Sequence, residues 1–218
     1  MKNKRLFYFL MFLPLFSVLI SLQFLPDQIP AHYGITGEVD RWGSKYEVFI
    51  FPGITIIFGL VILIITKYAA KQEKDGNNNQ KIGFTTGILL LLLFNIMTFY
   101  FLYTDIIKAE NLAVVFIDPM QLIFISLGMI IMIIGNIMPK VKMNSMIGLR
   151  TTWSMKNEIT WRKSQRFGGI SFIVDGILII VGCCFTKGFV CYLWSISILI
   201  VSLPIDIYYT YKVAKKYN

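Results

Sequence analysis

The sequence predicts an all-α polytopic membrane protein with six transmembrane helices. Apolar residues make up 56% of the 218 residues and charged residues only 15%, against about 45–50% and about 25% in soluble domains. Six apolar stretches approach the roughly 20 residues that a helix needs to cross a bilayer. The Lys and Arg residues also fall on alternate sides of these stretches. Because so few polar side chains cannot cover a soluble surface, a soluble enzyme is excluded as the default class.

The first predicted span resembles a signal peptide because basic residues precede it. It ends at Pro26 without the small residues of a cleavage site, which predicts an uncleaved anchor. The fifth and sixth spans are separated only by a turn at Lys187-Gly188, which predicts an antiparallel helical hairpin. The six spans are expected at residues 6–25, 47–66, 82–103, 118–138, 167–186 and 189–210.

The distribution of positive charge predicts the orientation. With the N-terminus in the cytoplasm, the inner segments hold 17 of the 21 Lys and Arg residues, and the outer loops hold 4. Inner loops of membrane proteins carry an excess of these residues. We therefore expect a multi-pass protein of the bacterial inner membrane with both termini in the cytoplasm.

The connecting segments suggest three parts: an N-terminal two-span domain at 1–66, a cytoplasmic linker at 67–81, and a four-span domain at 82–218. Residues 71–80 are polar and of low complexity, which is typical of a flexible connector. The sequence has no convincing internal repeat, which disfavours a transporter built from symmetric halves.

The outer loop at 26–46 contains one candidate site. Its glycines permit a turn, so that 29–33 and 38–42 are expected to pair as a short hairpin. His32, Glu38 and Asp40 would then converge and could form a metal or proton site. The other interpretation is a folded loop in which His32 makes a structural hydrogen bond. Since spacing alone is a weak metal signal, we favour the hydrogen bond and predict neither a metal nor a cofactor.

The inner loop at 139–166 carries seven basic residues, which should attract anionic lipid. A short helix is expected from Ser154, as its N-cap, to Arg166. Trp153 and Trp161 suit the membrane–water boundary, where amphipathic rings settle.

Three polar residues lie inside spans, where they are costly and often functional. Asp175 is about 12 Å deep in the fifth span at 1.5 Å per residue, and Asp206 lies on the sixth. Both fall on small-residue stripes that can meet across the helical hairpin. The pair could form a proton relay or serve in helix packing, and packing is favoured for both and for Asn95.

Motifs of several enzyme classes are missing. The sequence has no phosphate-binding Gly-Lys-Ser/Thr loop, no His-Glu-x-x-His and no Gly-x-Ser-x-Gly, and His32 is its one histidine. We therefore expect no enzyme. Direct binding of nucleic acid is not expected either, because the positive charge is divided among four segments next to the bilayer.

Both ordered loops resemble a known family. Ile29-Pro30-x-His32, then Gly37-Glu38-Val39-Asp40 and Lys45, resembles the domain of unknown function that precedes SdpI-like membrane proteins. The inner loop resembles the SdpI signature itself, through Asn136, Lys142, Asn144, Gly148, Arg150, Trp153 and Trp161. The inner loop departs from that signature at three positions. Met143 and Thr152 stand where the family usually has prolines, and Gln165 stands where the family usually has a histidine.

The resemblance implies a membrane immunity protein. Such a protein would give resistance to a secreted peptide toxin and could also act as a receptor that sequesters a small cytoplasmic repressor. The partners would be the lipid bilayer, the toxin outside and the repressor inside. The toxin-facing loop would include His32, Gly37, Glu38, Asp40 and Lys45. A small transporter or lipid-handling protein that uses Asp175 and Asp206 is the alternative.

Overall fold

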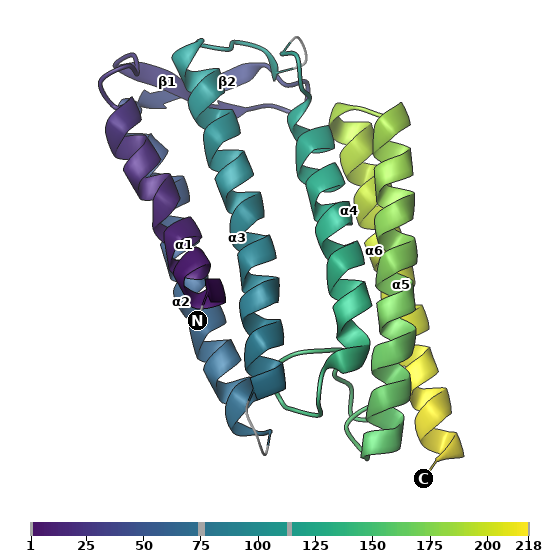
Figure 1. The fold of residues 1–218 in the computed structure, drawn as a ribbon. Coiled ribbons are helices and arrows are strands. Elements are labelled where there is room, and N and C mark those ends of the chain that lie inside the picture. Colours follow the sequence, from purple (N-terminus) through teal and green to yellow (C-terminus); the bar gives the residue numbers. More distant parts are fainter. Residues whose placement is uncertain (1, 74–76, 113–114, 218) are drawn as a thin grey trace.

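The computed structural model describes residues 2–73, 77–112 and 115–217. Its six long helices stand side by side, with a two-stranded hairpin across one end (Figure 1). Each helix is long and apolar enough to cross a membrane, so the six-span prediction is confirmed. The helices are α1 (Lys2–Ser21), α2 (Ile50–Lys71), α3 (Asn77–Ile106), α4 (Pro119–Ile137), α5 (Glu158–Phe185) and α6 (Gly188–Lys216).

The helices form two groups of three. In the first group α3 packs against both α1 and α2, and in the second α4 and α6 both pack against α5. The first core contains Phe7, Met11 and Leu91, whereas Ile179 and Cys183 belong to the second. The contact between α3 and α4, which joins the two groups, is smaller than the contacts of α3 with α1 and α2 and than those of α5 with α4 and α6. The division into domains at residue 82 stays a prediction, and the packing places α3 with the N-terminal helices.

Asn95 shows how a polar residue serves packing within a span. It is buried on α3, and its amide donates hydrogen bonds to the carbonyl oxygens of Leu10 at 2.9 Å and of Leu91 at 2.7 Å. The first of these bonds joins α3 to α1. Asn95 therefore contributes to helix association, as the packing interpretation expects.

The hairpin at one end consists of β1 (Gln28–Tyr33) and β2 (Val39–Ser44), which pair antiparallel. The predicted pairing of 29–33 with 38–42 is confirmed. A 3₁₀ helix at Lys45–Phe49 connects the hairpin to α2. We refer to this end of the bundle as the hairpin end. The opposite end, toward which both chain termini point, is the basic end (Figure 1).

Two expectations about the basic end differ from the structure. The linker predicted at 67–81 is much shorter, because α2 continues to Lys71 and α3 already begins at Asn77; residues 74–76 of that linker lie outside the described residues. The short helix expected from Ser154 to Arg166 is not separate. Asn157 caps α5, with its side chain accepting from the backbone N–H groups of Ile159 and Thr160, and the helix continues unbroken to Phe185.

Candidate recognition site

The hairpin is held in shape by its turn, by a hydrogen bond between His32 and Asp40, and by two ion pairs. Gly37 has a φ of 86°, a conformation that favours glycine. His32 Nδ1 lies 2.6 Å from Asp40 Oδ1 across the strands. The two ion pairs link Arg41 to Glu47 and Lys45 to Asp27, each at 2.8 Å.

The hairpin is also tied to the connection between α3 and α4. The backbone N–H of Val39 donates to the carbonyl oxygen of Glu110 at 2.9 Å, and that of Leu112 donates to Gly37 at 2.8 Å. The Tyr33 hydroxyl donates to the carbonyl oxygen of Ala109 at 3.0 Å. Burial is the main reason why the pKa of Tyr33 is raised to about 12, so the hydroxyl keeps its proton at neutral pH. We call these contacts the outer tie.

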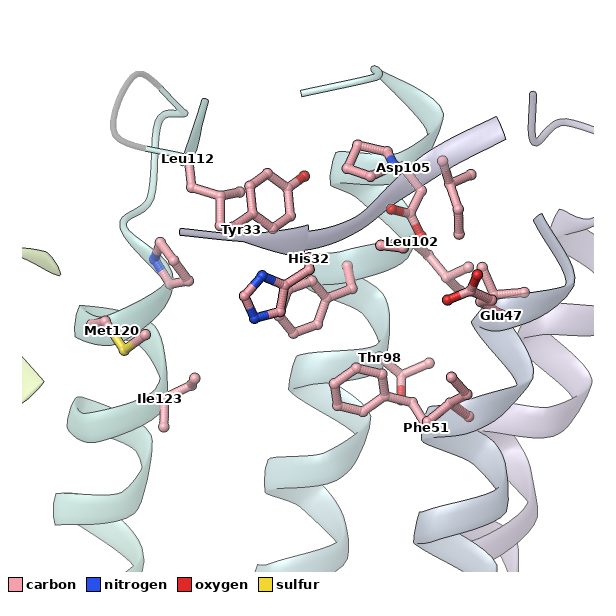
Figure 2. Close-up of a pocket in the computed structure, with 17 residues that line it drawn as sticks. His32, Tyr33, Glu47, Phe51, Thr98, Leu102, Asp105, Leu112, Met120 and Ile123 are labelled. Carbon is pink, nitrogen blue, oxygen red and sulfur yellow. The ribbon is translucent and has the colours of Figure 1, made fainter. Parts of the chain in front are cut away.

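A cavity of about 340 Å³ lies beneath the hairpin, between the two helix groups. Figure 2 shows His32 and Tyr33 of β1 on one side of it, Phe51 of α2 and Thr98 of α3 on another, and Ile123 of α4 opposite. The lining is mostly apolar, with a few polar side chains. This size and composition are typical of a small-molecule or side-chain binding pocket.

Asp105 is a buried acidic residue at this cavity that sequence reasoning missed, as it also missed Glu47 and Thr98. Asp105 lies in the last turn of α3, lines the cavity and is 5% exposed. None of the ion pairs in the described ranges includes it. The available signal was an acidic residue directly after an apolar span, at a point where the predicted span had already ended.

The predicted outer-loop residues are only partly brought together. His32 lines the cavity and contacts Asp40, whereas Gly37 forms the turn and the Glu38 side chain is exposed. Lys45 pairs with Asp27 near the start of the hairpin, and this contact is the main reason why the pKa of Asp27 is lowered. The described residues contain no group of three potential metal ligands. His32 shares a hydrogen bond with Asp40, which is the kind of contact that was favoured for it.

At the basic end, the loop between α4 and α5 folds around Trp161. This side chain is 1% exposed, packs with Ile82 and Val141, and donates its indole N–H to the carbonyl oxygen of Val141 at 2.8 Å. The expected position at the membrane–water boundary is thus wrong for Trp161, since it lies in a core. Gly148 has a φ of 106°, and a Cβ there would press on Gln165 and Trp161.

Asn144 and Gln165 order the same loop. The Asn144 carboxamide accepts from the backbone N–H groups of Met146 and Ile147 and donates to Lys142 and Ile147 carbonyl oxygens. Gln165 bonds both the N–H and the carbonyl of Leu149, each at 2.9 Å. These two side chains therefore fix the conformation of the loop through hydrogen bonds.

The junction of α2 and α3 binds this loop directly, through the C-cap residue of α2 and the first turn of α3. Asn79 is fully buried, accepts from the N–H of Lys142 at 3.0 Å and donates to its carbonyl oxygen at 3.3 Å. Asn78 donates to Lys140, and Gln72 exchanges two hydrogen bonds with Ser145 at 2.6 and 2.7 Å. We call these contacts the inner tie. Gln72, Asn78 and Asn79, which fall within the segment predicted as a flexible linker, therefore form a joint between the two helix groups.

Comparison with known proteins matches both regions. Residues 9–56 match a domain of unknown function, DUF1648, and residues 140–208 match the SdpI/YfhL protein family. The immunity protein SdpI of Bacillus subtilis (strain 168) is 25% identical over 218 residues, which are 100% of this chain and 99% of that protein. The chain is an SdpI-like membrane protein. The resemblance inferred from the two loops is thereby confirmed.

A second relative is similar over a smaller part. An uncharacterized protein of Archaeoglobus fulgidus is 45% identical over 49 residues, which cover 22% of the SdpI-like chain and 27% of the archaeal protein. No solved structure matches the chain.

The remaining signature residues of the SdpI-like chain are dispersed. Trp153 packs edge-on against Tyr211 of α6, with ring centroids 5.4 Å apart. Asn136 is exposed in the last turn of α4. Arg150 is also exposed, and it lines a cavity of about 310 Å³ between the loop and the helices that Asp206 lines too. The signature thus mainly builds a folded loop, and Arg150 is its charged group at a cavity.

The two aspartates lie on the packed faces of α5 and α6, as their spacing predicts. Asp175 is 5% exposed and Asp206 is 3% exposed. One carboxylate oxygen of each, Oδ2 of Asp175 and Oδ1 of Asp206, is buried without a hydrogen-bond partner. None of the ion pairs within residues 2–73, 77–112 and 115–217 joins either aspartate to Arg162 or Arg166.

Proposed function

We propose that the chain is a non-enzymatic bacterial membrane immunity protein that gives resistance to a secreted peptide toxin. The similarity to the immunity protein SdpI over both full lengths is the observation that carries this proposal. The hairpin end would face outward and the basic end the cytoplasm, as the charge distribution predicts.

The cavity beneath the hairpin would bind an apolar segment of the toxin. Its lining offers apolar surface near the membrane boundary, and the buried carboxyl of Asp105 offers a polar group to fix the orientation of the ligand. A hydrophobic peptide that arrives from outside meets this end of the bundle first. Under this proposal the outer loop helps to recognise the toxin, and no bound metal is needed for that role.

Filling this cavity tests the proposal. We expect Ile123→Trp to lower resistance at least about tenfold, the effect of losing about 1.4 kcal/mol of binding, because the larger ring occupies the space beneath the hairpin. Resistance is measured as the toxin concentration that stops growth of a sensitive strain expressing the chain. The matched control is Ile133→Trp on the same helix, where the side chain is 43% exposed. Equal resistance in both variants, at equal expression, would refute the cavity as the toxin site.

The chain would also act as a receptor that sequesters a small repressor at its basic end. Arg150 would contribute, since it is an exposed cation in an ordered loop and lines a cavity at that end. Arg150→Ala is expected to abolish membrane recruitment of a fluorescent repressor fusion while toxin resistance is retained. Recruitment at the wild-type level would exclude Arg150 from the repressor contact.

A small transporter or lipid-handling protein is the second candidate function. The observation that favours it is the pair of buried carboxylate oxygens of Asp175 and Asp206 that lack partners, because such groups in a membrane often carry protons. Under this alternative, Asp175→Asn abolishes resistance although the protein stays folded. If the toxin is instead recognised by the cavity beneath the hairpin, Asp175→Asn should leave resistance unchanged.

A further inference from the structure

Two hollows meet on the outer face formed by α5 and α6. The first, of about 380 Å³, lies at the basic end and is lined by Arg162, Lys163 and Arg166 together with aromatic and apolar side chains. The second, of about 500 Å³, continues along the same two helices and is mostly apolar, although Asp175 and three serines also line it. Phe167 and Ile170 line both hollows. The two therefore form one continuous groove with a charged end and an apolar end.

The charged end offers three exposed cations. Arg162 and Arg166 are one helical turn apart, so they share a face of α5. The rings of Phe167 and Tyr209 stack between the two helices, with centroids 3.8 Å apart. The lining of this hollow includes no acidic residue. Paired guanidinium groups are well suited to bind a phosphate through charge-assisted hydrogen bonds.

The apolar end has the length of one bilayer leaflet. Ile170, Val174 and Leu178 follow one another on successive turns of α5, and Val201 and Ile205 of α6 face the same groove. From Arg166 to Leu178 the helix rises about 18 Å, slightly more than half of the roughly 30 Å hydrocarbon thickness. A chain that begins at the arginines would therefore end near the middle of the bilayer.

We propose that this groove binds one anionic phospholipid. The headgroup phosphate would lie on Arg162 and Arg166, and one acyl chain would lie along Ile170, Val174 and Leu178. A free phosphate would not use the apolar part, and a zwitterionic lipid would gain less from a hollow that is lined by three cations and by no acidic residue. The proposal is independent of toxin recognition by the cavity beneath the hairpin, because the groove lies on a different face of the molecule.

Native mass spectrometry of the purified full-length protein tests the proposal, by counting retained phosphatidylglycerol against phosphatidylcholine. We expect one phosphatidylglycerol to be retained selectively, and Arg162→Gln with Arg166→Gln to lower its apparent affinity at least about tenfold. The matched control is Lys67→Gln with Lys71→Gln, which removes two exposed cations from α2 at the same end. An equal loss in this control would show general charge attraction and overturn the site.

A second variant tests the apolar part without changing charge. Val174 is 47% exposed, so Val174→Trp is expected to fold normally, fill the groove and lower retention of phosphatidylglycerol at least about fivefold. The control Ile200→Trp, at a side chain that is 64% exposed on α6, should leave retention unchanged. Unchanged retention in Val174→Trp, or equal competition by inorganic phosphate, would overturn a phospholipid site in favour of a simple anion site.

Discussion

Trp161→Ala is expected to lower the free energy of unfolding by about 3–5 kcal/mol, which is the usual cost of removing a buried Trp. The indole is 1% exposed and packs between Ile82 of α3 and Val141 of the loop. Its removal leaves a cavity and also leaves the carbonyl oxygen of Val141 without its donor. Unfolding in detergent, followed by intrinsic fluorescence and circular dichroism, measures the loss.

Two further variants separate the causes of this loss. Trp161→Phe retains most of the apolar volume but removes the indole N–H, so we expect a smaller loss of about 1–2 kcal/mol. Trp153→Ala is the matched control, because Trp153 is only partly buried in the same loop. A loss for Trp153→Ala as large as that for Trp161→Ala would contradict the assignment of Trp161 as the centre of the loop.

Asn79→Ala is expected to destabilise the protein by about 2–3 kcal/mol, because it removes the centre of the inner tie. The fully buried carboxamide bonds both the N–H and the carbonyl of Lys142, and these groups would be left without it. The loop at 140–147 should then separate from α3. Hydrogen exchange of the Lys142 amide, together with the melting temperature, measures this effect.

The neighbouring residue provides the control. None of the bonds of the inner tie involves Gln80, so Gln80→Ala should change the melting temperature little and leave exchange at Lys142 slow. Asn79→Asp keeps the acceptor for Lys142 N–H and loses the donor, and it should have an intermediate effect. If Asn79→Ala left exchange at Lys142 unchanged, the joint would not hold the loop.

The spans and the hairpin were predictable because each depends on a local pattern. Apolar length identifies a membrane helix without knowledge of its neighbours. Gly37 marks the turn of the hairpin in the same way, and His32 and Asp40 lie at a spacing that brings them together across it. These features therefore follow from residues close in the chain.

The inner tie and the outer cavity were not predictable, because both join segments that are far apart in the sequence. The amides of Asn78 and Asn79 have the composition of a solvated linker, and only the position of the loop at 140–145 gives them partners. Asp105 becomes a cavity residue only when α3, α4 and β1 converge. Trp161 was misplaced since an amphipathic ring suits both an interface and a core with a nearby carbonyl.

The inner tie joins the two helix groups at the basic end, because its amides lie at the junction of α2 and α3 and their partners lie in the loop that leads to α5. At the hairpin end the outer tie instead binds the hairpin to residues 109–112, which directly follow α3 of the same group. Sliding one group past the other along the membrane normal would stretch the bonds of the inner tie, whereas rotation about that tie would disturb fewer of them. A signal that crosses the membrane through this protein should therefore be a change in the angle between the groups rather than a piston-like shift.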